Sequence, residues 1–215
     1  MESNSNLNGT RGKLAEDGEL AMFIDKKEHI VFSVFERANL EKIKSFLLEN
    51  KQNNYNIFYG KLDIEKDIIP KQGGAHFPKV VFFKPKQTDI VVQYSNYFDG
   101  LNSLSNCLSD NLKEPFYKFE FSNPETLDKK FSFGKYGAGE ILRVVYAMQD
   151  PKWIFYEQGK ILPFENTVNY EKKRIKDRLN KEIIIKYCSQ LGFEIKNNNF
   201  WESAEPSLFY ECISW

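Results

Sequence analysis

Hydrophobic and polar positions divide the first half of the chain into short strands and two helices. Apolar runs with β-branched and aromatic residues predict strands, and apolar residues at three- to four-residue spacing predict helices. The predicted strands are 20–24, 30–35, 55–62, 77–83 and 89–94. The predicted helices are 40–49, which Asn39 can cap, and 101–112. This order is typical of a compact α/β unit, with a sheet flanked by helices.

The second half of the chain shows a different pattern, with more alternation and one long apolar stripe. The predicted strands are 116–121, 153–156, 161–164, 193–195 and 208–213, and residues 141–148 fit a strand or a short helix. The strands on either side of Glu-Gln-Gly-Lys are expected to form a hairpin. Apolar residues at four-residue spacing predict one long helix over 169–191. This half is therefore predicted to be an α+β domain with a mostly antiparallel sheet.

The change of pattern also predicts how the 215 residues are divided. Residues 1–18 are polar and glycine-containing, which is typical of a mobile N-terminal arm. An α/β domain is expected over 19–114 and an α+β interaction domain over 115–215.

Residues 20–112 resemble a thioredoxin-like domain. The stretch HFPKVVFFKP, with Pro78 ahead of an apolar strand and its hairpin partner, is similar to the cis-proline strand of that superfamily. The resemblance implies a thioredoxin-like α/β fold and a structural role for Pro78. Where the family carries its reactive cysteines, residues 36–39 are Glu-Arg-Ala-Asn, and the first cysteine of the chain is Cys107. The resemblance therefore implies a redox-inactive domain of a kind that commonly serves as a docking scaffold.

Charge is balanced over the whole chain but not along it. Thirty Lys and Arg residues against 30 Asp and Glu residues give a formal net charge of zero, which makes a nucleic-acid partner unlikely. Within 171–181, by contrast, six cations stand against two anions, and Arg174, Arg178 and Lys181 would share one stripe of a helix. This stripe indicates a basic contact surface, or alternatively a solvated helix face with ion pairs four residues apart.

Aromatic residues lie among acidic residues in the C-terminal segment. Because Trp and Tyr dominate many binding hot spots, this mixture indicates an interaction surface, with packing of the terminal strand as the alternative. The candidate partner-binding residues of the whole chain are Arg174, Arg178, Lys181, Ile185, Phe200, Trp201, Glu202 and Glu205.

The sequence predicts no catalytic residue, no cofactor and no metal site. Three cysteines and two histidines lack the spacing of a zinc site, and Gly-Lys-Tyr-Gly-Ala-Gly at 134–139 fits a turn better than a phosphate loop. No secretory leader and no apolar run of membrane-spanning length is apparent. We therefore expect a cytoplasmic protein without a membrane partner.

These features favour a non-catalytic protein-binding module with a protein partner of unknown identity. The chain as a whole loosely resembles bacterial immunity-type binding proteins, which implies an immunity or antitoxin function that inhibits one partner. Two alternatives stay open at this point. One is a thiol-dependent enzyme or redox accessory that uses Cys188 or Cys212, and the other is an RNA-binding protein that uses the 171–181 helix.

Overall fold

The computed structural model describes residues 22–51, 53–71, 76–86, 88–123 and 125–214. The arm predicted over 1–18 lies outside these residues, and so does the start of the strand predicted over 20–24. The described part of that strand belongs instead to a short 3-10 helix, η1 (Phe23–Asp25).

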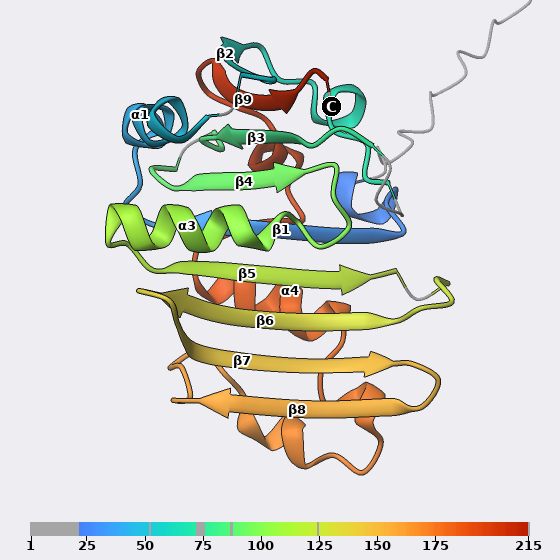
Figure 1. Ribbon diagram of the computed structural model, residues 1–215. Coiled ribbons are helices and arrows are strands. Elements are labelled where there is room, and N and C mark those ends of the chain that lie inside the picture. Colours follow the sequence, from blue (N-terminus) through green and yellow to red (C-terminus); the bar gives the residue numbers. More distant parts are fainter. Residues whose placement is uncertain (1–21, 52, 72–75, 87, 124, 215) are drawn as a thin grey trace, which may run out of the picture.

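The fold is built on one sheet of nine strands (Figure 1). The strands are β1 (His29–Phe35), β2 (Tyr55–Gly60), β3 (Lys79–Phe83), β4 (Val91–Ser95), β5 (Phe116–Ser122), β6 (Lys130–Gly137), β7 (Glu140–Gln149), β8 (Trp153–Gly159) and β9 (Ser207–Cys212). Their order across the sheet is β2-β9-β3-β4-β1-β5-β6-β7-β8, and every neighbouring pair is antiparallel.

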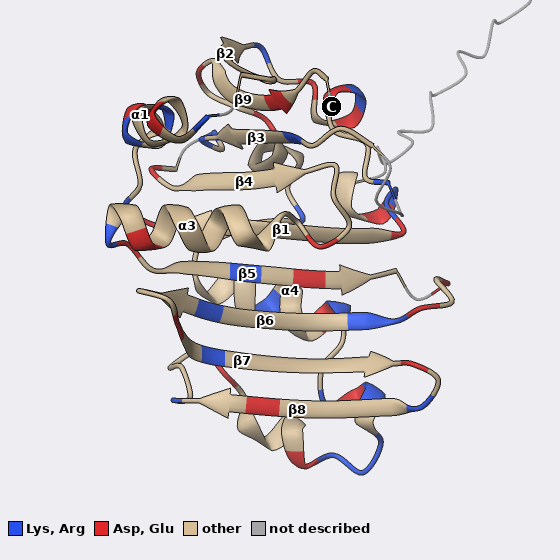
Figure 2. Ribbon diagram, viewed as in Figure 1, with Lys and Arg blue, Asp and Glu red and all other residues tan. Residues whose placement is uncertain are grey.

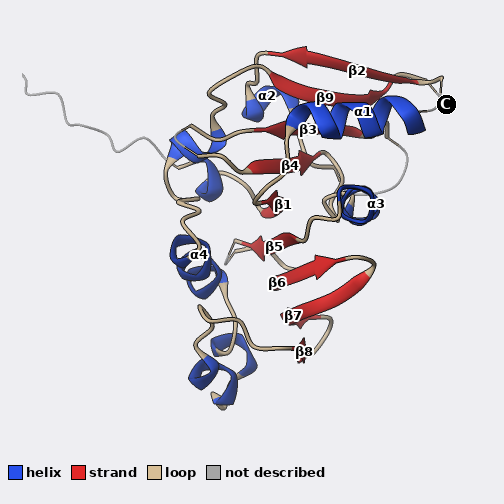
Figure 3. Cartoon of the chain, turned by 90° about the vertical axis from the view of Figure 1, so that its left-hand side faces the viewer, coloured by secondary structure: helices blue, strands red, loops and turns tan. Residues whose placement is uncertain are grey.

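Helices lie on both faces of this sheet (Figure 3). The α-helices are α1 (Leu40–Asn50), α2 (Ile64–Asp67), α3 (Asn102–Leu112) and α4 (Lys181–Gln190), and the further 3-10 helices are η2 (Thr167–Glu171), η3 (Ile175–Asp177) and η4 (Asn198–Trp201). One face carries α1 and α3, whereas α4 and the 3-10 helices lie on the other. Since side chains of a strand alternate between faces, the buried residues form two clusters, one on each side of the sheet.

Local signals account for several elements as the sequence predicts them. The Asn39 Oδ1 atom accepts a hydrogen bond from the Glu41 N–H at 2.7 Å, so α1 begins where the capping residue indicates. Its Leu40, Ile43 and Leu47 side chains are buried, which is the apolar face that the spacing predicts. The hairpin of β3 and β4 is also confirmed.

The thioredoxin-like fold class is wrong. In the structure β1 lies between β4 and β5, and β2 lies at the far end of the sheet beside β9. The C-terminal strand β9 therefore occupies the place between β2 and β3, and no local pattern indicates a partner so distant in sequence. The described residues contain no cis peptide bond, so Pro78 is trans. It is buried at the start of β3, and its carbonyl accepts the Cys212 N–H at 2.8 Å.

The single long helix and the second hairpin of the C-terminal half are also wrong. The chain from 167 to 180 forms η2, η3 and turns instead of one helix. The helix α4 starts only at Lys181, because Asn180 is extended and its Oδ1 atom accepts the Ile183 N–H at 3.0 Å. The strand β8 runs on through Glu-Gln-Gly and pairs with β7 instead of folding back on residues 161–164. The division of the chain at residue 114 stays a prediction.

Substitution of the capping residue tests the start of α4. Asn180→Ala removes the hydrogen bond to the Ile183 N–H, so the free energy of unfolding should fall by about 1 kcal/mol in urea titrations. Asn180→Asp keeps an acceptor and should retain most of that stability. If the helix ran continuously through this position, alanine would be the better helix former, and Asn180→Ala would raise the stability instead.

Candidate functional site

One region of the sheet has apolar side chains but no helix in front of it. On β6 and β7, Phe131, Phe133, Val145 and Ala147 belong to the core beneath α4. Because side chains alternate, their neighbours point to the opposite side. Those neighbours, with the equivalent residues of β8, are Ser132, Val144, Tyr146, Met148, Ile154 and Tyr156, and we call this set the open face.

The open face is left bare by the placement of α1 and α3. Both helices lie over the half of the sheet that contains β3, β4 and β1, and α3 reaches no further than β6 (Figure 1). The five apolar or aromatic residues of the open face belong to neither core cluster. Ile154 and Tyr156 are each 42% exposed. Figure 2 shows that β7 and β8 carry few charged residues along their length.

Stacked aromatic rings form part of this surface and of the sheet beside it. Tyr146 and Tyr156 stack across β7 and β8 with their centroids 5.2 Å apart. On β6, a Cβ atom at Gly134 would lie 2.6 Å from the Tyr136 ring, so the ring lies over this glycine and would have to move to make room for a larger residue. The Tyr136 ring also stacks on Phe116 at 5.3 Å, which fixes its position.

A polar strip separates the open face from the start of α3. The His29 ring stacks on Phe98 at 4.0 Å, its Nδ1 lies 3.1 Å from Ser122 Oγ, and its Nε2 lies 3.3 Å from Glu120 Oε1. A serine, a histidine and a carboxylate in contact are the components of a nucleophilic site. Here, however, Ser122 is fully buried, and its Oγ also contacts the Asp128 carbonyl and the Lys130 N–H. These contacts and the Phe98 ring leave no access for a substrate, so we assign the strip a structural role.

Glu120 is the electrostatic centre of this strip. Burial alone would raise the pKa of its carboxyl group, but the hydrogen bond from His29, the charge of Lys118 and the hydrogen bond from Ser132 Oγ together hold that pKa below its ordinary value. The folded protein therefore stabilises the ionised carboxylate.

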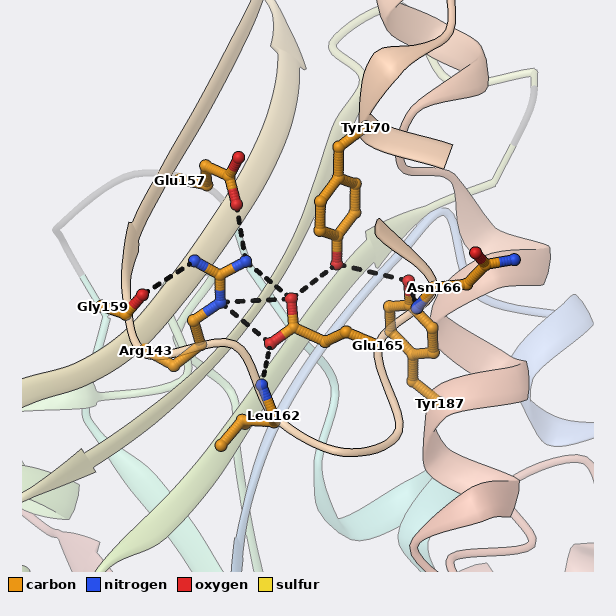
Figure 4. Close-up of polar contacts among 8 residues, drawn as sticks. All are labelled: Arg143, Glu157, Gly159, Leu162, Glu165, Asn166, Tyr170 and Tyr187. Atoms are coloured by element: carbon orange, nitrogen blue, oxygen red, sulfur yellow. Dashed lines mark hydrogen bonds and ion pairs between the residues drawn. The ribbon is translucent and has the colours of Figure 1, made fainter. Parts of the chain in front are cut away.

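On the opposite face of the sheet, a buried arginine holds the β7–β8 hairpin in place (Figure 4). Arg143 is 1% exposed, and its Nη2 atom lies 2.6 Å from a carboxylate oxygen of Glu165 and 2.6 Å from one of Glu157. Its Nε atom also donates to Glu165, and its Nη1 atom donates to the Gly159 carbonyl at 3.3 Å. Burial alone would lower the pKa of Arg143, but the two carboxylates raise it, so the guanidinium keeps its charge.

The same network ties the hairpin to the helical layer behind it. The Glu165 carboxylate, whose side chain is fully buried, accepts hydrogen bonds from Leu162 N–H at 2.8 Å and from Tyr170 Oη at 2.9 Å. Tyr170 and Tyr187 are 3.2 Å apart through their hydroxyl oxygens, and Tyr187 lies on α4 (Figure 4). Because every charge in this network is paired, the hairpin that carries the open face rests on a rigid support.

The predicted basic stripe does not form. Arg174 pairs with Asp177 at 2.6 Å, and the Arg178 guanidinium lies 5.3 Å from the centre of the Phe155 ring. Lys181 is 7% exposed, and its Nζ atom lies 2.6 Å from Asp25 Oδ1. These three cations therefore point to different neighbours, because the residues that carry them do not belong to one helix.

The other predicted partner-binding residues are also separate from the open face. Phe200 and Trp201 are 4% and 2% exposed and pack in the core, which is the alternative that the sequence left open. Glu202 pairs with Lys86, and Glu205 lies 3.4 Å from Lys84. Together with Lys181, Ile185 lines a hollow of about 1010 Å³ that also contains Asp25, Lys26 and Leu127. A role in partner binding for this set stays a prediction.

The two cysteines of the thiol alternative are both buried. Burial raises the pKa of the Cys188 thiol well above its usual range, and the side chain is 0% exposed. The Cys212 Sγ atom lies 3.0 Å from the Ser214 carbonyl, to which it donates. Within the described ranges, no group of three or more His, Cys, Asp or Glu side chains is arranged to hold a metal ion.

The sequence does contain one signal for the open face. Residues 144–148 are apolar at every position, which in a strand means apolar side chains on both faces of the sheet. Such a strand needs a cover on each side, and the structure supplies one only on the side of α4. Arg143 was missed as well, because its two carboxylate partners come from residues 14 and 22 positions later.

Comparison of the chain with protein-family models, with curated proteins and with solved structures found no match. In the part of the chain that the structure describes, no helix has the length and apolar character needed to cross a membrane.

Removal of the buried arginine tests the support of the hairpin. Arg143→Met leaves the Glu165 carboxylate buried without its cation, so the free energy of unfolding should fall by about 3–5 kcal/mol. The matched control is Arg174→Met, which breaks an ion pair of a largely exposed arginine and should cost well under about 1 kcal/mol. Equal losses in the two variants, measured by urea denaturation, would show that the network contributes no more than a surface pair.

The lowered pKa of Glu120 predicts an acid-dependent part of the stability. Because the folded-state pKa lies below that of the unfolded chain, this contribution is present above the unfolded value and is lost as the pH falls through the folded value. Glu120→Gln should therefore flatten the decline in unfolding free energy between neutral and acidic pH. An unchanged slope in denaturation curves taken across this range would contradict the assignment.

Proposed function

We propose that the protein is a protein-binding module that holds its partner against the open face. The observation that carries the proposal is the gathering of Val144, Tyr146, Met148, Ile154 and Tyr156 on two adjacent strands that no described helix covers. Contiguous exposed apolar surface of this kind commonly marks an interaction site.

The chemistry of the open face favours a protein over a nucleic acid. A single-stranded nucleic acid requires a basic groove in addition to aromatic rings. The tyrosines here lie among Val144, Met148 and Ile154, and the Tyr156 hydroxyl donates a hydrogen bond to Gln158 Oε1 at 2.7 Å. At the border of the open face, the charge of Lys118 is balanced by the neighbouring Glu120 carboxylate. Aromatic anchors among aliphatic side chains, with a polar border, are the arrangement of a protein–protein hot spot.

The structure offers less support for the two alternatives. For the hypothesis of a thiol-dependent enzyme, burial strongly raises the pKa of Cys188, and the Cys212 thiol donates to the Ser214 carbonyl. The RNA-binding hypothesis requires a continuous basic helix over 171–181, and this part of the chain contains short 3-10 helices and turns instead. We keep the cytoplasm as the proposed compartment. We also propose inhibition of the partner as the outcome of binding, as the resemblance to immunity-type proteins implies.

Lysine substitutions on and off the open face test the proposal. Ile154→Lys and Tyr156→Lys place a charge in the centre of the proposed interface, and each should weaken partner capture by about 30-fold or more. The matched control is Val168→Lys, because Val168 is 69% exposed and lies on η2, on the opposite side of the sheet from the open face. Capture would be measured by quantitative mass spectrometry on proteins from native lysate bound to each immobilised variant.

Two results would contradict the proposal. In one, no protein is enriched by the unsubstituted chain over a blank column. In the other, the enriched proteins are retained by Ile154→Lys and Tyr156→Lys as well as by the control.

A further inference from the structure

The two ends of the sheet differ in how they are protected. A strand at the end of a sheet exposes unpaired N–H and C=O groups, and proteins normally protect it with charges, proline or a covering segment. The strand β8 is protected in this way, since Pro151 precedes it, Glu157 lies within it, and η3 packs behind it. The strand β2, which ends the sheet on the other side, has the sequence Tyr-Asn-Ile-Phe-Tyr-Gly, without charge or proline.

Hydrogen bonding shows which groups of β2 face outward. The Ile213 N–H donates to the Asn54 carbonyl at 2.9 Å. The backbone N–H and C=O groups of Asn54 and of every second residue after it therefore point toward β9. The alternate residues Tyr55, Ile57 and Tyr59 therefore direct their N–H and C=O groups to the open edge. Among the described residues, none forms a backbone hydrogen bond with these groups.

Side-chain contacts fix β2 against β9 and α1. Tyr55 stacks on Tyr210 at 4.5 Å, and Phe58 stacks on Phe209 at 5.1 Å, so rings on both faces join β2 to β9. Tyr59 Oη donates to Glu41 on α1 at 2.7 Å. Phe58 is still 40% exposed, which leaves apolar area to be buried by a neighbour.

We propose that a second copy of this chain pairs with β2 in an antiparallel arrangement, which joins two nine-stranded sheets into one. With a two-fold axis at Ile57, this residue faces its own copy, and Tyr55 faces Tyr59 of the second copy. Each of these facing pairs exchanges two backbone hydrogen bonds. Because β2 carries no charge, self-pairing brings no like charges together, as it would for an edge that contained Lys or Glu.

Two features favour a second copy over another occupant. A whole subunit brings its own helical layers, so the edge must be clear on both faces, and in Figures 1 and 3 no described helix extends past β2. In addition, the chain has one unprotected edge and one protected edge. Pairing through a single edge closes after two copies, whereas two unprotected edges would allow open-ended assembly.

The proposal is tested by sedimentation equilibrium of the full chain over a range of micromolar concentrations. The unsubstituted protein should have twice the mass of the chain. Ile57→Pro removes an outward N–H but leaves the hydrogen bonds to β9, and it should raise the dissociation constant at least tenfold. Ile57→Ala loses the same side chain but keeps the N–H, so it should remain a dimer.

A second variant keeps the test valid if Ile57→Pro does not fold, as judged by circular dichroism. Ile57→Lys retains the backbone N–H and places two ammonium groups opposite each other on the axis, so it should be a monomer. A monomeric unsubstituted protein at all concentrations would overturn the proposal, and so would a dimer that neither Ile57→Pro nor Ile57→Lys weakens. Neither outcome bears on partner capture by the open face, which lies at the other end of the sheet.

Discussion

Unequal cover of a nine-stranded sheet is the constraint on which the rest of this structure depends. A strand with apolar side chains on both faces is stable only where both faces are shielded from water. On one face, α4 and the 3-10 helices cover the sheet from β3 to β8. On the other face, α1 and α3 cover only the half that contains β1, β3 and β4. The apolar residues left in front of β7 and β8 are the site that we assign to a partner.

The buried Arg143 explains how a bare hairpin at the end of the sheet remains in place. Its guanidinium joins β7, β8 and the 160–171 segment through paired charges on the covered side. Such a network contributes little net stability compared with an apolar core, but it fixes one arrangement of the elements around it. Rigid support on one face and exposed rings on the other together lower the entropic cost of binding a partner.

Only part of this could be predicted from the sequence. The capped helix α1 and the β3–β4 hairpin follow from signals within a few residues, and both were predicted correctly. The place of β9 between β2 and β3 depends on pairing across more than 120 residues, as in Lys79 with Glu211, and no local pattern contains that information. The cap at Asn180 was hidden by an apolar stripe that continues across it, so periodicity alone extended the helix too far.

Oxidative footprinting of Met148 and Tyr156 is the most direct measurement of whether the open face is a binding surface. Hydroxyl radicals should modify both side chains in the free protein, because no described helix shields them. In the presence of the captured partner, modification of both should fall several-fold, while that of the exposed Val168 on η2 stays the same. Equal modification of Met148 and Tyr156 in the free and bound protein would contradict the account.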